Sequence, residues 1–220
     1  MPDSWRIPVG WQLSYRAVTG STNDDGREAA SFGSGGPVVF LADDQWAGRG
    51  RYGRSWIAPA ESSLLFSILA RTSLEPILLT ATCSVAVAEV LREATGLAAR
   101  IKWPNDVMVG ERKICGVLTE VVGAAPAATI VGLGLNVNLA LDAPGLPETA
   151  TSVSAELGRP FSRQLLFERI IARIDTALRL DPAELAAATW MRWEALLWRR
   201  SQLVRVADGG QKWEGIVEGL

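Results

Sequence analysis

One short segment of the chain concentrates residues that bind anions. The run GRGRYGR, from Gly48 to Arg54, holds three glycines and three arginines. Glycine lets the backbone close around a ligand, and arginine presents a planar fork to a phosphate or a carboxylate. The composition therefore indicates an anion-binding loop, although it allows a solvated surface loop equally well.

The same run satisfies the pattern G-x-G-x-x-G of dinucleotide-binding sites. Such a site needs a strand before the glycines and a helix directly after them, because the helix N-terminus holds the pyrophosphate. Here the continuation RSWIAP, from Arg54 to Pro59, leads into another strand. We therefore reject a Rossmann interpretation.

The amino-acid composition excludes several kinds of catalytic site and several classes of protein. The chain has no histidine, so proton transfer must fall to Lys, Asp, Glu or the substrate. With 22 basic and 24 acidic residues, the net charge of −2 lacks the basic surplus of a duplex-binding protein. Cys83 and Cys115 form no CxxC motif and are typical of buried apolar groups in a reducing compartment. We find no signal peptide and no apolar run long enough for a membrane span, and we expect a cytoplasmic protein.

The hydrophobic pattern predicts an α+β fold, a mixed β-sheet flanked by helices, rather than a regular βαβ alternation. Strands are expected at residues 10–17, 37–42, 63–70, 99–103, 107–109, 113–122 and 129–139. Helices are expected to start at residue 21 and to span residues 76–95, 162–180 and 182–198. Ser21 and Asp24 fit a capping box, residues 43–55 a loop, and Gly132 and Gly134 a close approach of the backbone to another group.

Four further segments accompany the arginine loop. They are STN (21–23), KWPND (102–106), KICGVLTE (113–120) and GLGLN (132–136). In their order and approximate spacing, the five segments resemble biotin–protein ligases from about residue 13 to 139. One such motif would be weak evidence, but five in order are specific.

The resemblance implies a class II synthetase-like biotin/lipoate ligase fold in residues 1–198 and a partial SH3-like β segment in residues 199–220. It also implies a two-step reaction. ATP converts biotin to biotinyl-5'-AMP, and a lysine of the biotin carboxyl carrier protein of acetyl-CoA carboxylase then takes the biotin. Two anions meet in the first step, so cations must offset their repulsion, and a closing loop must keep water from the mixed anhydride.

The resemblance further implies a role for each matching residue. The expected biotin-binding residues are Ser21, Thr22, Asn23, Gln45, Arg49, Gly50, Arg51, Lys113 and Gly116. The expected ATP-binding residues are Arg49, Arg51, Arg54, Trp56, Lys102, Asn105, Lys113 and Asn136. The expected catalytic residues are Lys113, Arg51, Lys102 and Asp106, and Asp106 is also the expected Mg²⁺ ligand.

Several of these residues have an ordinary alternative interpretation. Ser21 is equally a plain helix cap, Gln45 a loop amide, and Trp56 a core aromatic rather than a platform for adenine. Lys102 and Lys113 fit exposed lysines as well, and the Pro-Asn-Asp sequence is typical of a turn. Two other functions also stay open: a lipoate ligase or octanoyl transferase of the same fold, and a non-catalytic biotin-binding pseudoenzyme.

The sequence departs from the resembled family at both ends. Many members begin with a helix-turn-helix domain, but the STN motif here starts at residue 21, so we expect no DNA binding. After Ser201 the chain supplies about two of the roughly five strands of an SH3-like barrel. That module is therefore degenerate or the sequence is incomplete. The strand edge left free permits a homodimer without requiring one.

Overall fold

The computed structural model describes residues 4–31, 37–123, 128–208 and 210–219 of the chain. Its main strands are β1 Gln12–Thr19, β2 Val38–Gln45, β3 Ser63–Arg71, β4 Ala99–Lys102, β5 Asp106–Val109, β6 Arg112–Val122 and β7 Ala128–Asn136. Within the described residues they form one seven-stranded sheet in the order β1-β2-β3-β7-β6-β5-β4. The β1–β2 pair is parallel and the other pairs are antiparallel, which confirms the mixed sheet.

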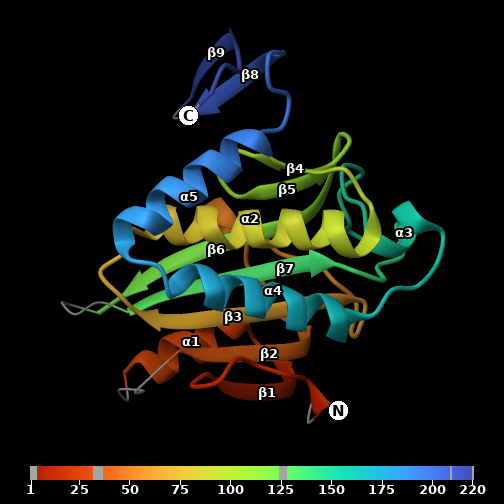
Figure 1. Cartoon of the computed structure of the whole chain (residues 1–220). Helices are drawn as coiled ribbons and strands as arrows, with labels where there is room; N and C mark the ends of the chain where they lie inside the picture. The colour runs from red at the N-terminus through yellow and green to blue at the C-terminus, as the bar shows by residue number, and fades with distance from the viewer. Residues whose placement is uncertain (1–3, 32–36, 124–127, 209, 220) are drawn as a thin grey trace.

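Three helices cover one face of this sheet (Figure 1). They are α2 Pro76–Thr95, α4 Arg163–Leu178 and α5 Pro182–Ala195. Helix α2 has the predicted bounds and is buried along most of its length against β6, β4 and the two other helices. It ends at Gly96, whose φ of 76° is the left-handed conformation that glycine adopts without strain.

Because side chains alternate along each strand, the sheet has one face in the main core and a second face on the opposite side. On β7, Val131, Leu133 and Leu135 belong to the main core with α2. Ile130 points the opposite way, because a Cβ on Gly26 of α1 (Thr22–Ala30) would lie only 3.2 Å from it. Helix α1 therefore covers part of the second face, and the rest of that face is left for other residues.

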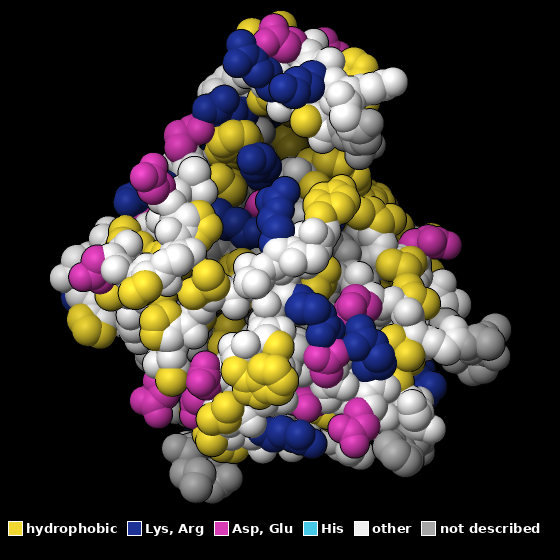
Figure 2. All heavy atoms as spheres, turned by 180° about the vertical axis from the view of Figure 1, so that it is seen from behind, with side chains coloured by type: hydrophobic (Ala, Val, Ile, Leu, Met, Phe, Trp, Pro, Cys, Tyr) yellow, Lys and Arg dark blue, Asp and Glu magenta, His cyan; other side chains and the backbone are white. Residues whose placement is uncertain are grey.

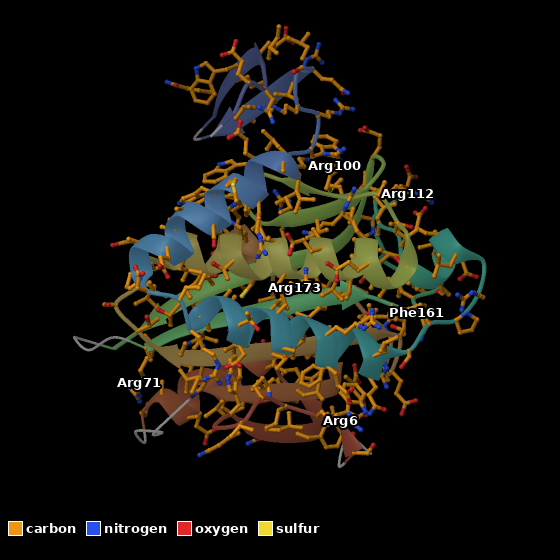
Figure 3. The ribbon with its side chains drawn as sticks, in the orientation of Figure 1. Arg6, Arg71, Arg100, Arg112, Phe161 and Arg173 are labelled. Carbon is orange, nitrogen blue, oxygen red and sulfur yellow. The ribbon has the colours of Figure 1, made fainter. Side chains whose placement is uncertain are left out.

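Ion pairs join the helices of the core face to one another. Arg173 of α4 lies between α4 and α2, where its guanidinium is 2.7 Å from Glu89 Oε2 and 2.7 Å from Glu93 Oε2 (Figure 3). Arg192 of α5 approaches the same Glu89 at 3.5 Å. Such partly exposed pairs contribute about 0–1 kcal/mol each, so the apolar core beneath them is the main source of stability.

A small hairpin lies beyond the β4 edge of the sheet (Figure 1). It consists of β8 Leu203–Asp208 and β9 Gln211–Ile216, which pair antiparallel. These are the two strands expected of the partial SH3-like segment. The domain boundary at residues 198–199 stays a prediction.

Two local expectations were wrong. Strand β2 continues to Gln45, so the polar loop begins later than Asp43, because Asp44 and Gln45 pair with Val18 and Thr19 of β1. The short helix α3, Val153–Leu157, was missed; Ser152 caps it by accepting a hydrogen bond from Ala155 N. None of the helices in the described residues is long and apolar enough to cross a membrane.

Candidate active site

A cavity of about 1270 Å³ opens on the sheet face opposite α2. All the residues expected at the site line this cavity. They are Ser21, Thr22, Asn23, Gln45, Arg49, Gly50, Arg51, Arg54, Trp56, Lys102, Asn105, Asp106, Lys113, Gly116 and Asn136. Figure 2 shows this side of the molecule, where basic side chains gather in the hollow between the C-terminal hairpin and the sheet. The five motifs thus meet in one place, while their roles toward ligands stay predictions.

The STN motif begins helix α1 at one end of the cavity. Ser21 is the N-cap, and its Oγ accepts a hydrogen bond from Asn23 N at 3.3 Å. The expected capping box with Asp24 was wrong, because the Asp24 carboxylate binds Arg27 and Arg49 instead. The cap fixes the backbone of the motif and leaves the next two side chains to face the cavity.

A buried polar network surrounds Thr22. Gln45 Oε1 accepts hydrogen bonds from Thr22 N at 2.7 Å and from Thr22 Oγ1 at 3.1 Å. Thr22 Oγ1 also lies 2.7 Å from Ser67 Oγ of β3. Ser67 was not predicted from the sequence, although it is a serine between apolar residues of a buried strand. Gln45 is accordingly part of the β2 end and the network, not an ordinary loop amide.

The Asn23 amide is fixed by hydrogen bonds to two side chains. Its Oδ1 accepts from Ser67 Oγ at 2.6 Å, and its Nδ2 donates to Glu120 Oε2 at 2.7 Å. Opposite it, a Cβ on Gly132 would lie 2.1 Å from Asn23 Oδ1. The predicted close approach at Gly132 is therefore confirmed, with Asn23 as the group that needs the space.

The arginine loop is a narrow hairpin. Its stem is closed by hydrogen bonds from Trp56 N to Gly48 O at 2.8 Å and from Gly50 N to Arg54 O at 2.7 Å. A single 3₁₀ turn, Arg51–Gly53, forms the tip, with Tyr52 at a φ of 58°. The segment that follows leads into β3 without a helix, which confirms that this is not a Rossmann phosphate loop.

The arginines of this loop have different partners. Arg49, on the stem, makes two hydrogen bonds to Asp24, at 2.6 and 2.8 Å. The Arg49 guanidinium holds the pKa of Asp24 below its ordinary value. Arg51, at the tip, donates to Asn105 Oδ1 at 3.2 Å and to Tyr52 Oη at 3.1 Å. Arg54 is exposed at the rim of the cavity.

Lys113 points into the cavity because β6 has a bulge. Register shifts so that Val107 pairs with Cys115 but Met108 pairs with Lys113, which leaves Ile114 as an extra residue. Ile114 and Cys115 are consecutive and both belong to the main core. Lys113 therefore faces the cavity, with Nζ 2.6 Å from Asp106 Oδ1. Its alternative as a solvated turn lysine is wrong.

The KWPND segment supplies the opposite wall. Asn105 Nδ2 donates to Val117 O at 2.8 Å and Val117 N donates to Asn105 O at 2.9 Å, so the turn is tied to β6. The Trp103–Pro104 peptide within it is cis. Lys102 Nζ lies 5.1 Å from the ring centroid of Trp198, within cation–π range. The segment is thus both a turn and part of the cavity lining.

Trp56 lies against the two glycines that pair across β6 and β7. A Cβ on Gly134 would be 2.5 Å from Trp56 Cε2, and one on Gly116 would be 3.0 Å from Trp56 Cζ3. Lys113 Nζ lies 5.4 Å from the centroid of the same ring. Among the described residues, the buried Trp56 Nε1 finds no acceptor. The half-buried indole is therefore a wall of the cavity and not a core aromatic.

Asn136 differs from the other lining residues. It is buried, and its Nδ2 donates to Thr151 O at 3.0 Å. Its Oδ1 lies 3.5 Å from Ser63 Oγ. Because the amide is engaged by the protein, the structure accounts for Asn136 without a ligand, and its contact with ATP stays a prediction.

A family model described as the Biotin/lipoate A/B protein ligase family matches residues 17–138, more than half of the chain. The chain belongs to this family. Among curated members, it is 36% identical over 188 residues to a biotin–[acetyl-CoA-carboxylase] ligase of Paracoccus denitrificans, covering 82% of this chain and 72% of that protein. It is 32% identical over 170 residues to the bifunctional ligase/repressor BirA of Bacillus subtilis, covering 74% of this chain and 52% of that protein.

Solved structures of the ligase family agree with the fold. The biotin protein ligase from Aquifex aeolicus in complex with biotin and ATP has a TM-score of 0.84 and 27% identity, and the match covers 95% of this chain and 88% of that one. This ligase-family chain nevertheless spans only about half the length of several curated relatives, including BirA of Bacillus subtilis and of Escherichia coli.

Proposed function

We propose that this chain is a biotin–protein ligase that activates biotin with ATP as biotinyl-5'-AMP and transfers it to a lysine of a biotin carboxyl carrier protein. The observation that supports the proposal most is the convergence of the STN motif, the arginine loop and Lys113 on one cavity. The named activity of the Paracoccus denitrificans relative and the ligands of the Aquifex aeolicus structure agree with it.

In the first step, a carboxylate oxygen of biotin attacks the α-phosphorus of ATP. The bond from that phosphorus to the bridging oxygen breaks, and pyrophosphate leaves with the electron pair. Lys113 and Arg51 are the cations we assign to the charge that gathers at this point, because both line the cavity and neither is in the apolar core. Thr22, Asn23 and Gln45, which line the cavity, would hold the ureido ring.

In the second step, the acceptor amine attacks the carbonyl carbon of the adenylate. The bond to the AMP oxygen breaks, AMP leaves with the electron pair, and the amine loses a proton. Because AMP is an activated leaving group, orientation can supply most of the rate, and no nucleophilic side chain is required. This agrees with a chain that has no histidine.

We assign the adenine to Trp56 and the phosphates to Lys102 and the arginine loop. The unpaired Trp56 N–H is a donor without an acceptor in the described part of the chain, and a ligand can relieve the cost of burying it. Mg²⁺ would arrive with the ATP. The described residues contain no group of three metal-ligating side chains, and Mg²⁺ that is held largely by phosphates and water needs only one carboxylate, here Asp106.

Biotin-dependent exchange of labelled pyrophosphate into ATP tests the first step. We expect exchange with biotin and MgATP, and none when biotin is omitted. The family model covers lipoate ligases as well, so lipoate and octanoate belong in the same assay. Exchange with lipoate alone would contradict the assignment of biotin, and binding without exchange would indicate a pseudoenzyme.

Mass spectrometry of a carrier domain tests the second step. We expect a mass increase of one biotinyl group on one lysine after incubation with biotin, MgATP and this chain. A carrier variant with arginine at that lysine is the matched control, because it keeps the charge but lacks the nucleophile. Exchange without transfer would support the adenylation and contradict the proposed acceptor.

A further inference from the structure

Four charged side chains form a closed cluster behind the arginine loop. We call it the anchor cluster: Asp24 and Arg27 of α1, Arg49 of the loop stem, and Glu120 of β6. Arg27 NH2 is 2.8 Å from Glu120 Oε1, and Arg27 also pairs with Asp24. Arg49 NH2 is 3.5 Å from Glu120 Oε2, in addition to its two bonds with Asp24. The cluster contains two positive and two negative groups, so its charges balance.

This balance changes what Arg49 can do. An arginine that already donates two hydrogen bonds to one carboxylate is largely neutralised by it and attracts a second anion less, and moving the arginine away would leave Asp24 without that partner. In the described residues, by contrast, no carboxylate lies within ion-pair distance of Arg51, which bonds only neutral oxygens. The two arginines are therefore not equivalent, although the same ligands were predicted for both from the sequence.

Arg49 and Arg51 also occupy different parts of the hairpin. Arg49 is on the stem, where it bridges to Ser55, and Arg51 begins the tip. The cluster ties the stem to α1 and to β6, while the tip has the left-handed Tyr52, a conformation that costs a bulky residue about 1 kcal/mol. The stem is thus held by charged contacts to two other elements, whereas the Arg51 side chain at the tip is held only by hydrogen bonds to neutral groups.

We propose that Asp24 and Glu120 are positioning residues that anchor the arginine loop through Arg49, leaving Arg51 alone to close on the anionic intermediate. Glu120 also accepts a hydrogen bond from the Asn23 amide at 2.7 Å, so one carboxylate contacts both the STN motif and the stem of the arginine loop. This inference rests on the proposed function for its ligand, but the anchoring itself is a property of the unliganded protein.

The alternative, in which Arg49 contacts the anion directly, predicts effects of the opposite sign. If Asp24 merely competes for Arg49, then Asp24→Asn frees the guanidinium and the adenylate is released more slowly. If Asp24 anchors the loop, the same substitution loosens the stem and the adenylate is released about fivefold faster, as expected for losing an interaction of about 1 kcal/mol.

The experiment is a chase of preformed labelled biotinyl-adenylate with excess unlabelled biotin. We expect faster release from Asp24→Asn, partial rescue by Asp24→Glu, and, for both variants, a maximal pyrophosphate-exchange rate within about twofold of wild type. Arg51→Ala should lower that maximal rate itself. Glu28→Gln is the matched control, because it removes the same charge from the same helix outside the cluster. Slower or unchanged release from Asp24→Asn would overturn the proposal.

Hydrogen exchange on the unliganded protein separates this proposal from the proposed function. The amides of Gly50 and Trp56 close the loop stem, so Asp24→Asn should speed their exchange while Glu28→Gln should not. Thermal melting identifies a variant that has lost its fold. If the wild type had no ligase activity but these amides responded, the function would fail and the anchor would stand. Unaltered exchange at both amides would refute the anchor.

Discussion

Alanine substitutions at Gly132 and Gly134 test whether Asn23 and Trp56 occupy separate parts of the cavity on the second sheet face. Both are on β7, two residues apart, and both line the cavity. A Cβ added at Gly134 would lie 2.5 Å from Trp56 Cε2, and one added at Gly132 would lie 2.1 Å from Asn23 Oδ1. The same substitution, glycine to alanine, therefore disturbs two different parts of the proposed site.

The expected magnitudes follow from these contacts. Carbon atoms pack at about 3.5–4.0 Å, so in Gly134→Ala the rigid indole must retreat by about 1 Å or more. We expect ATP affinity to fall about fivefold, because an aromatic stacking contact contributes about 0.5–1.5 kcal/mol. In Gly132→Ala the Asn23 amide must leave its bonds to Ser67 and Glu120. Unpairing buried polar groups costs about 1–3 kcal/mol, so we expect biotin affinity to fall about tenfold to a hundredfold.

Isothermal titration of each variant with biotin and with a non-hydrolysable ATP analogue measures both effects. Gly215→Ala in β9 is the control, since a Cβ there meets nothing within 4 Å. Alanine in a strand is otherwise favourable by about 0.5–1 kcal/mol relative to glycine, so a loss of affinity cannot come from backbone propensity. Equal losses of both ligands in both variants, or normal ATP binding by Gly134→Ala, would refute the division of the face between Asn23 and Trp56.

Three further predictions concern single side chains. Lys113→Ala should lower pyrophosphate exchange by about a hundredfold or more, because it removes a preorganised cation and leaves Asp106 without its 2.6 Å partner; exchange at the wild-type rate would contradict the assignment. Arg51→Ala should release biotinyl-adenylate into solution, which chromatography of the reaction filtrate detects, and an adenylate retained as in the wild type would contradict it. Burial raises the pKa of Cys83 to about 12 and that of Cys115 further still, so neither thiol should react with a disulfide reagent at pH 8 until the protein is unfolded; rapid labelling of the native protein would show that the core opens.

Much of the fold follows from local patterns. Helix α2 is predictable to the residue because a long apolar run begins at Pro76 and ends before Gly96. The hairpin of β5 and β6 follows from two apolar runs around Gly110-Glu111-Arg112. Strand order does not follow, because the pairing of β3 with β7 joins segments about 65 residues apart whose partners depend on the whole sheet.

The sequence predicted residues that line one cavity, but it did not predict the contacts among them. The motifs identify Arg49 and Arg51 as neighbours, yet nothing in GRGRYGR shows that one of them is bound by Asp24 and the other by neutral groups. The contacts of Ser67 and Glu120 could not be predicted for a related reason. Each is an ordinary residue for a strand, and its importance comes only from the helix that the fold places over it.

The bulge at Ile114 decides on which face of the sheet Lys113 lies. If β6 paired with β5 without the bulge, alternation would turn Lys113 toward the core, and an ammonium group would be transferred from water into a hydrocarbon environment at prohibitive cost. The charge of Lys113 therefore disfavours the alignment without the bulge and favours the one in which the lysine faces the cavity. An apolar residue at this position would remove the cation from the cavity and, with it, the penalty that disfavours the alignment without the bulge.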